Sequence, residues 1–169
     1  MNTQAMTQDE KRQYLITELL KERPEYADIS VPKDETEQKK LLRALFNVRL
    51  PLPISDDFLV VQDEYLQEEI AQKGITSTDD LEPIKPDIYL WQGDITTLKC
   101  DAIVNAANSQ MLGCFCPNHG CIDNAIHTFS GVQLRLKCAE IMQNQGKDEE
   151  TGKALSLIHI SEPTRRYAI

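Results

Sequence analysis

The sequence predicts an α/β fold preceded by a small helical region. Residues 9–73 carry apolar side chains three and four positions apart, which is the spacing of amphipathic helices. Residues 88–104 instead contain short apolar runs bounded by Gly, Asp and Asn, which is typical of buried strands, and helical spacing returns over residues 122–145. A turn-rich segment with two prolines, residues 75–86, separates the two regions.

Three helices are expected before this boundary. The first spans Asp9–Glu22 and the second Glu35–Asn47, each with apolar residues gathered on one face. The third begins after Ser55, whose hydroxyl can cap a helix, and runs through Lys73. Gly74 then provides the residue that most readily ends a helix.

Two strands and a divided helix are expected after it. Ile88–Trp91 and Ala102–Val104 are the short apolar runs, and we expect both to be buried strands. Ile122–Gln145 is helical, in two pieces around Gly131. Helices and strands alternating in this way favour an α/β architecture.

Composition excludes several classes of function. The 169 residues have 18 basic and 27 acidic side chains, and the formal net charge of −9 opposes binding to nucleic acid. No apolar run approaches the length of a membrane span, and the polar N-terminus lacks the apolar part of a signal peptide. Because three of the five cysteines cluster around a histidine, we expect metal binding in the reducing cytoplasm and not a disulfide framework.

Polar motifs follow both predicted strands. In Gly93-Asp94-Ile95-Thr96 the carboxylate can accept a hydrogen bond from the exocyclic amine of a base, although an aspartate here is also a common turn or helix cap. In Asn105-Ala106-Ala107-Asn108 the small residues let a ligand approach the backbone, and the two amides can bond to ribose hydroxyls. An asparagine-rich turn is the alternative for the second motif.

Thiol and imidazole donors fill the next loop, at Cys114, Cys116, His119 and Cys121. Such donors within eight residues suit Zn²⁺. Three ligands would leave a fourth position open for water or substrate, whereas four would close the site and make it structural. Only one residue separates Cys114 from Cys116, which makes joint ligation awkward and favours three ligands. Reduced thiols without a metal are the remaining alternative.

Together these motifs resemble the macrodomain family. The pattern Cys-x4-His-x-Cys resembles the zinc-dependent branch of that family, the protein-ADP-ribose hydrolases, and maps onto Cys114, His119 and Cys121. The resemblance covers residues 86–154. It implies a macrodomain-like α/β/α fold with a mixed sheet, of which this chain holds the N-terminal half, with Zn²⁺ as the cofactor.

The same resemblance assigns roles to the other motifs. Asp94 and the backbone of Ile95 would hold adenine, and Asn105 and Asn108 would line the ribose side of the pocket. The chain then enters a helix at Ile122, whose first N–H groups face the loop, a favourable place for a diphosphate.

Asp123 comes two residues after the last of the three implied ligands. The resemblance gives this carboxylate the task of orienting a water or the distal ribose, with Asn108 fixing that ribose. A plain acidic residue in the first turn of a helix is the alternative. His127, four residues further on, is expected to pack inside the fold.

The sequence of the tail indicates that it does not belong to the natural protein. Leu155–Arg165 resembles the translation of a sequencing-library adapter, with a genuine strand and polar tail as the alternative. We therefore expect a helical region at 1–85, a partial macrodomain at 86–154 and a non-native tail at 155–169. In such a truncated chain the later strands of the family would be missing, so we expect the fragment itself to be inactive and His159 to have no function.

The intact parent is expected to be a zinc-dependent hydrolase that removes ADP-ribose from modified proteins. A macrodomain that binds ADP-ribose without cleaving it, with structural zinc, is the alternative. Besides the ADP-ribosylated substrate and ADP-ribose, the resemblance implies a lipoyl carrier protein and a sirtuin-type transferase as partners.

Overall fold

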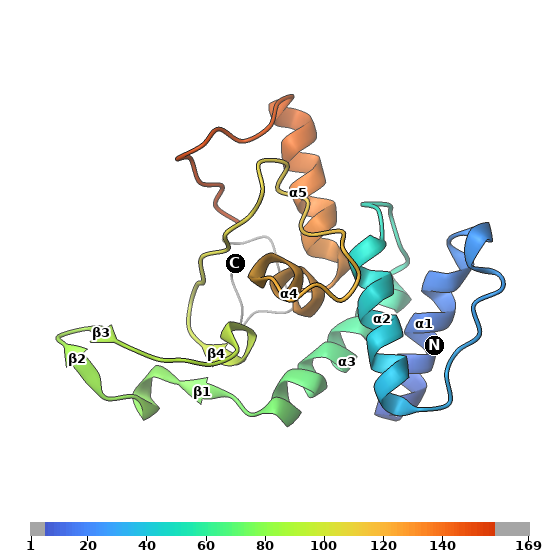
Figure 1. Cartoon of the computed structure of the whole chain (residues 1–169), viewed down its shortest axis with the longest axis horizontal. Helices are drawn as coiled ribbons and strands as arrows, with labels where there is room; N and C mark the ends of the chain where they lie inside the picture. The colour runs from blue at the N-terminus through green and yellow to red at the C-terminus, as the bar shows by residue number, and fades with distance from the viewer. Residues whose placement is uncertain (1–5, 158–169) are drawn as a thin grey trace.

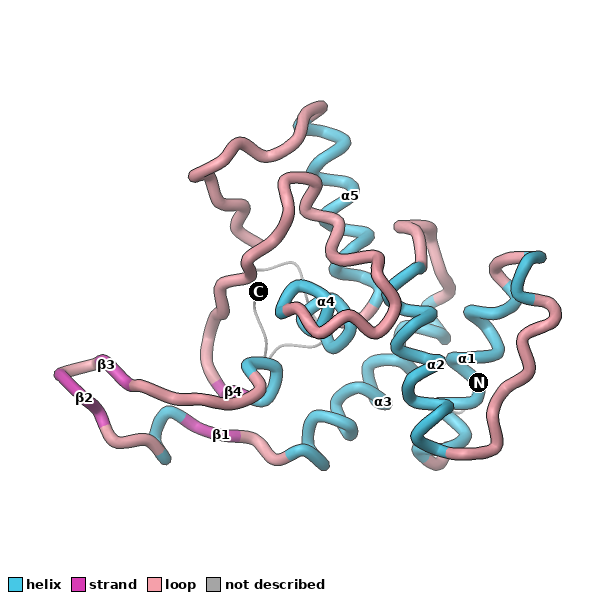
Figure 2. Tube along the Cα trace, viewed as in Figure 1, coloured by secondary structure: helices cyan, strands magenta, loops and turns pink. Residues whose placement is uncertain are grey.

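The computed structural model describes residues 6–157, in which three N-terminal helices pack together and short strands extend away from them (Figures 1 and 2). His159 and most of the adapter-like tail lie outside the described residues. Short 3-10 turns punctuate the chain at Pro24–Tyr26, Thr78–Asp80 and Ile95–Thr97. The helices are α1 (Gln8–Lys21), α2 (Glu35–Val48), α3 (Asp56–Lys73), α4 (Ile122–Phe129) and α5 (Val132–Gln145).

Side-chain caps fix where the first three helices begin. Thr7 forms a reciprocal capping box with Glu10 at α1. The Asp34 carboxylate caps α2, and the Ser55 hydroxyl caps α3 as the sequence predicts. Gly74 ends α3 with a φ of 86°, a backbone conformation that glycine adopts without strain. All three expected helices are confirmed within two residues at each end.

The main core lies between α1, α2 and α3. These helices bury their apolar faces against one another, and the start of α5 packs on the same cluster. Side chains that are removed from water in this way supply most of the stability of such a helical unit. The buried members are Leu15, Ile16, Leu19, Leu42, Leu45, Phe46, Phe58, Val61, Tyr65, Leu66 and Val132.

The strands are shorter and more exposed than the sequence predicts. β1 (Thr76–Ser77) pairs in parallel with β4 (Leu98–Lys99), and β2 (Pro83–Lys85) pairs antiparallel with β3 (Ile88–Tyr89). The fold class is therefore α/β with both kinds of strand pairing, as expected.

The prediction of two buried strands is wrong. The strand predicted over residues 88–91 shrinks to β3, and Leu90 is 80% exposed. The run Ala102–Val104 makes no strand ladder, and Val104 is 90% exposed. Buried strands need neighbours that pair with them and layers that cover both faces, and residues 6–157 place no such layers on these two runs.

A second, smaller core joins α4 and α5. Ile126, Leu134 and Cys138 form its buried centre, and the partly buried Leu157 packs against them. Gly131 divides the two helices as predicted, with a φ of 75°. Within the described part of the chain, no helix has both the length and the apolar character needed to cross a membrane.

Candidate metal centre

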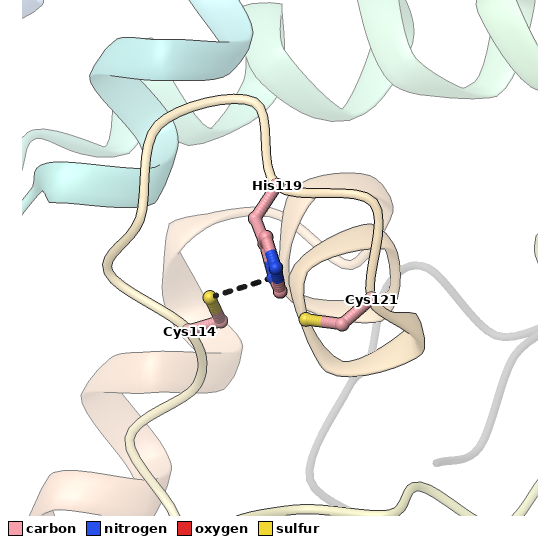
Figure 3. A group of neighbouring side chains, drawn as sticks. All are labelled: Cys114, His119 and Cys121. Carbon is pink, nitrogen blue, oxygen red and sulfur yellow. Dashed lines mark hydrogen bonds between the residues drawn. The ribbon is translucent and has the colours of Figure 1, made fainter.

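The loop between β4 and α4 brings three potential metal ligands together (Figure 3). The ligand atoms of Cys114, His119 and Cys121 all lie within 4.8 Å of one another. Cys121 is also the N-cap of α4, because its sulfur accepts a hydrogen bond from the backbone N–H of Asn124 at 3.4 Å. The helix start therefore fixes one ligand, and the loop carries the other two toward it.

The donor set and its spacing fit zinc. In a tetrahedral site with Zn–S of about 2.3 Å and Zn–N of about 2.0 Å, a bound sulfur and nitrogen lie about 3.5 Å apart. The sulfur of Cys114 and Nδ1 of His119 are 3.6 Å apart. Cys116 is exposed and is not a member of the cluster. The three side chains that the sequence predicts as ligands therefore lie together, with Cys116 outside their cluster, and the number of ligands around a metal stays a prediction.

Asp123 lies in the first turn of α4, where it is almost fully buried. Its Oδ1 accepts a hydrogen bond of 2.7 Å from Nδ2 of Asn105 and lies 3.6 Å from Nε2 of His127. The structure therefore brings together the first amide of one predicted motif and the acid next to the metal loop. The side-chain oxygen of Asn105, Oδ1, is buried and has no hydrogen-bond partner within residues 6–157.

His127 is buried behind Asp123, as the sequence predicts. Burial lowers the pKa of His127 to about 4, because it disfavours the charged ring. The negative charge of Asp123 raises the pKa but offsets only part of this effect, and the positive charge of Arg135 lowers it further. Its ring also packs against Gly113, where an added Cβ would meet the ring at 2.6 Å. The imidazole is therefore neutral at neutral pH and shapes the wall of the loop.

Asn108 shapes the start of the loop. Its Nδ2 donates to the carbonyl of Gly113 at 3.2 Å, and its Oδ1 accepts from the backbone of Gln110. These contacts form a turn, and Asn108 remains exposed on it.

Asp94 and Ile95 occupy a separate part of the surface. The Asp94 carboxylate caps the turn Ile95–Thr97 by accepting from the backbone and hydroxyl of Thr96, and it pairs with Lys73 at 3.0 Å. Burial alone would raise the pKa of Asp94, but these bonds outweigh it and lower the pKa below its ordinary value. The structure thus displays the capping role that the sequence offered as an alternative, and no hydrogen bond among the described residues joins Asp94 to the metal loop.

A small hollow lies beside that turn. Its lining includes Ile95, Ile103 and Phe129, so its wall is apolar at the position predicted for a base. Ile122, predicted to approach the diphosphate, is the first residue of α4 and is partly exposed.

Sequence reasoning missed three residues that hold the loop. Arg43 and Asn47 of α2 bond to its C-terminal half, and Arg135 of α5 bonds to its N-terminal half at the carbonyl of Leu112. The first two are four residues apart and share a helix face, which marks them as a pair. The sequence offers no signal of what they contact, because their partners lie more than 70 residues away.

These features define an α/β chain with a candidate metal site. Residues 104–161 match the Macro domain family. The chain is 60% identical over 153 residues to the protein-ADP-ribose hydrolase of Treponema medium, an alignment covering 88% of this chain and 59% of that protein. It is 52% identical over 143 residues to the protein-ADP-ribose hydrolase of Staphylococcus aureus strain MRSA252, covering 84% of this chain and 53% of the relative. The chain thus spans somewhat more than half the length of these curated relatives.

Proposed function

We propose that the protein carrying this chain is a hydrolase that removes ADP-ribose from modified proteins in a zinc-dependent manner. The observation that carries the proposal is the convergence of Cys114, His119 and Cys121 beside a buried aspartate, Asp123. The similarity to proteins named protein-ADP-ribose hydrolase supports the same class of reaction. Because the chain spans only part of those relatives, the activity is proposed for the whole protein.

Two thiolates and one imidazole would hold the zinc, which leaves one of four tetrahedral positions open. Zinc bound in this way supplies a Lewis acid that lowers the pKa of a bound water or hydroxyl. Cys121 would bind from the start of α4, and Cys114 and His119 from the loop. Cys116, which is exposed, stays outside the ligand set.

Asp123 would position the reacting hydroxyl or water. The contacts of its carboxylate with Asn105 and His127 both use Oδ1, and no hydrogen bond within residues 6–157 uses Oδ2, which could then accept a proton. The bond from Asn105 fixes the orientation of the carboxylate. Asn108, exposed at the start of the loop, would bond to the distal ribose.

The rest of ADP-ribose would extend from the loop toward Asp94. The first N–H groups of α4, beginning at Ile122, offer donors to a diphosphate. Asp94 and the backbone of Ile95 would meet the adenine beside the apolar wall that includes Ile103. For this, Asp94 would exchange its contact with Lys73 for one with the ligand.

One observation favours a second function, the binding of ADP-ribose without cleavage around a structural zinc. Asp123 is only 5% exposed and already holds Asn105, so a purely structural role also accounts for it. The two functions share the pocket and the metal but differ in whether zinc is needed for turnover.

The discriminating experiment uses an extended protein in which residues 1–154 are joined to the C-terminal segment of the Treponema medium relative. Release of ADP-ribose from a modified protein is measured for the parent and for Cys121→Ala, with Cys116→Ala as the matched control. We expect Cys121→Ala to lose both zinc and turnover, while Cys116→Ala keeps both. Turnover that survives the loss of zinc would refute the catalytic metal, and binding of ADP-ribose without any turnover would support the second function.

Several finer points remain part of the proposal. We propose from the sequence patterns a boundary at residue 85 and an end of the native sequence at residue 154, followed by a non-native tail. The same patterns are the basis for proposing that the isolated fragment is inactive and that the protein is cytoplasmic. A lipoyl carrier protein and a sirtuin-type transferase as partners follow from the family resemblance alone. A pull-down with the extended protein, with and without ADP-ribosylation, would test the partners.

A further inference from the structure

The helical region before the metal loop touches the loop directly through α2. Arg43 donates from Nη2 to the backbone carbonyl of His119 at 3.0 Å. Asn47, one turn later on the same face, accepts from the backbone N–H of Asn118 at 2.9 Å. Two successive residues of the loop, one of them a metal ligand, are therefore bonded to one helix face.

Asn124 extends this network to a second proposed ligand, Cys121. Its Oδ1 accepts from Nη2 of Arg43 at 2.9 Å, and its Nδ2 donates to the carbonyl of Cys116 at 3.0 Å. Its backbone N–H donates to the sulfur of Cys121. Through this one residue, Arg43 is linked to both the middle of the loop and its last ligand.

The two asparagines of the network are buried, whereas the bond from Arg43 to His119 is exposed, so water cannot readily replace the bonds that the asparagines make. Asn47 is 1% exposed and Asn124 is fully buried. Asn47 also donates to the hydroxyl of Thr128 at 3.0 Å, which ties α2 to the far end of α4. Removing one member would leave buried polar groups without partners, which costs more than the bond itself contributes.

The loop has little structure of its own to replace these bonds. Residues 110–121 contain no helix or strand, and the only backbone bond the structure shows between two of them joins His119 N–H to the carbonyl of Cys116 at 3.3 Å. Asn118 adopts a left-handed conformation with a φ of 53°, which asparagine tolerates but which must be held in place. The bond from its N–H to Asn47 supplies that restraint.

We propose that Arg43 and Asn47 are positioning residues of the metal centre, and that α2 holds its ligands converged before any metal binds. This inference rests on the proposed metal site for its effect on affinity, but its structural part can be measured without metal. Groups that orient metal ligands typically change metal affinity by roughly 10- to 100-fold when they are removed. The helical region before residue 86 then contributes to the metal site by holding its ligands in position.

The test uses the 169-residue chain and four variants. Arg43→Gln and Asn47→Ala remove the two supports. Arg43→Lys keeps the charge but lacks the planar guanidinium that bonds to two acceptors at once. Its Zn²⁺ affinity and its loop exchange rate should therefore lie between those of the parent and of Arg43→Gln. Arg49→Gln is the matched control, since Arg49 is a buried arginine at the end of α2 whose side chain bonds to Glu22 and not to the loop.

Two measurements are made on each variant. The first is the affinity for Zn²⁺, by competition with a chelator, and the sulfur-to-metal absorption of the Co²⁺ form. The second is amide hydrogen exchange over residues 114–121 in the metal-free chain. We expect Arg43→Gln and Asn47→Ala to weaken Zn²⁺ binding by roughly 10- to 100-fold. We also expect exchange at Asn118 to accelerate by roughly tenfold or more, with little change in Arg49→Gln.

The outcomes separate the two proposals. If the parent binds no Zn²⁺, the proposed metal centre fails, and the exchange data alone decide whether α2 positions the loop. Unchanged exchange and affinity in both support variants would overturn the inference. So would an equal loosening of the loop in Arg49→Gln, because the effect would then be general destabilisation.

Discussion

Nδ2 of Asn105 donates to Oδ1 of Asp123 at 2.7 Å, joining the loop after β4 to the first turn of α4. The two residues come from separate sequence motifs 18 positions apart. Their bond fixes the orientation of the buried carboxylate next to the metal loop. A pocket that is arranged before its ligand arrives avoids the cost of ordering those groups on binding.

Asp123→Asn separates the catalytic from the structural role of this residue. The amide oxygen can still accept from Asn105, so the packing is retained while the negative charge is lost. In the extended protein we expect turnover to fall by about 10²- to 10⁴-fold, as for a lost acid–base group, with the melting temperature little changed. Near-normal turnover would show that Asp123 has only a structural role. Asn105→Ala is the companion variant, because it removes the hydrogen bond that orients the Asp123 carboxylate.

Stability should depend on pH through His127. Its pKa falls from 6.5 to about 4 in the folded chain because burial disfavours the charged ring. The unfolded chain therefore binds the proton more readily between these values, so stability is complete above about pH 6.5 and declines as the pH falls toward 4.

Urea unfolding of the parent and of His127→Gln between pH 4 and pH 7.5 tests this assignment. The parent should lose stability across the window, and the variant should lose less because glutamine does not titrate. Equal slopes in the two proteins would assign the pH dependence to other groups.

Arg135 is predicted to be a structural anchor of the loop. Its guanidinium donates to the carbonyls of Leu112 and Phe46 and lies over the ring of Phe115 at 4.3 Å. Arg135→Met should lower the free energy of unfolding by about 2–4 kcal/mol, since buried carbonyls lose their donors.

Arg23→Met serves as the control for Arg135→Met. Arg23 pairs with Glu25 near the surface at 3.4 Å, so its loss should cost less than about 0.5 kcal/mol. Chemical denaturation measures both, and similar values for the two variants would contradict the anchoring role.

Two glycines of the loop should respond differently to alanine. Gly113 has a φ of 80°, and an added Cβ would meet the His127 ring at 2.6 Å. A Cβ on Gly120 would meet nothing within 4 Å. Gly113→Ala should therefore lower stability by at least about 1–2 kcal/mol, the cost of the left-handed conformation alone, while Gly120→Ala should change it little. Thermal unfolding of both variants provides the comparison, and equal effects would argue against the packing of His127 on Gly113.

Metal affinity should divide the cysteines into two groups. Cys114→Ser and Cys121→Ser each remove a proposed ligand, so we expect Zn²⁺ binding to weaken by at least about 100-fold, consistent with the preference of zinc for thiolates. Cys116→Ser should stay within about twofold of the parent, because Cys116 lies outside the cluster and is exposed. Competition with a chelator measures all three, and a large loss in Cys116→Ser would indicate four ligands.

The parts of the fold that depend on local sequence were predictable. The caps at Ser55 and Gly74 and the division at Gly131 act within a few residues, and the helices begin and end where they imply. The strands were not predictable in this way. The apolar run ending at Val104 has the composition of a buried strand, but pairing and coverage come from other parts of a fold. In residues 6–157 the run forms no strand ladder, and of its side chains only Ile103 packs against the smaller core.

The candidate site likewise has features that depend on local sequence and features that depend on distant contacts. The ligand spacing from Cys114 to Cys121 is a local pattern, and the structure brings those atoms together. The supports at Arg43 and Asn47 bond across more than 70 residues, so nothing near them in the sequence indicates their role. Asp94 illustrates a third case, in which one side chain suits both a cap and a ligand contact, and the structure displays the cap.

X-ray absorption at the zinc edge of the metal-loaded chain tests the central claim most directly, because it counts the ligand atoms around the metal. Coordination by Cys114, His119 and Cys121 predicts two sulfurs at about 2.3 Å and two lighter atoms at about 2.0–2.1 Å, one from the imidazole and one from water. Three sulfurs around the zinc would mean that Cys116 closes the site, and a chain that takes up no zinc would contradict the metal centre altogether.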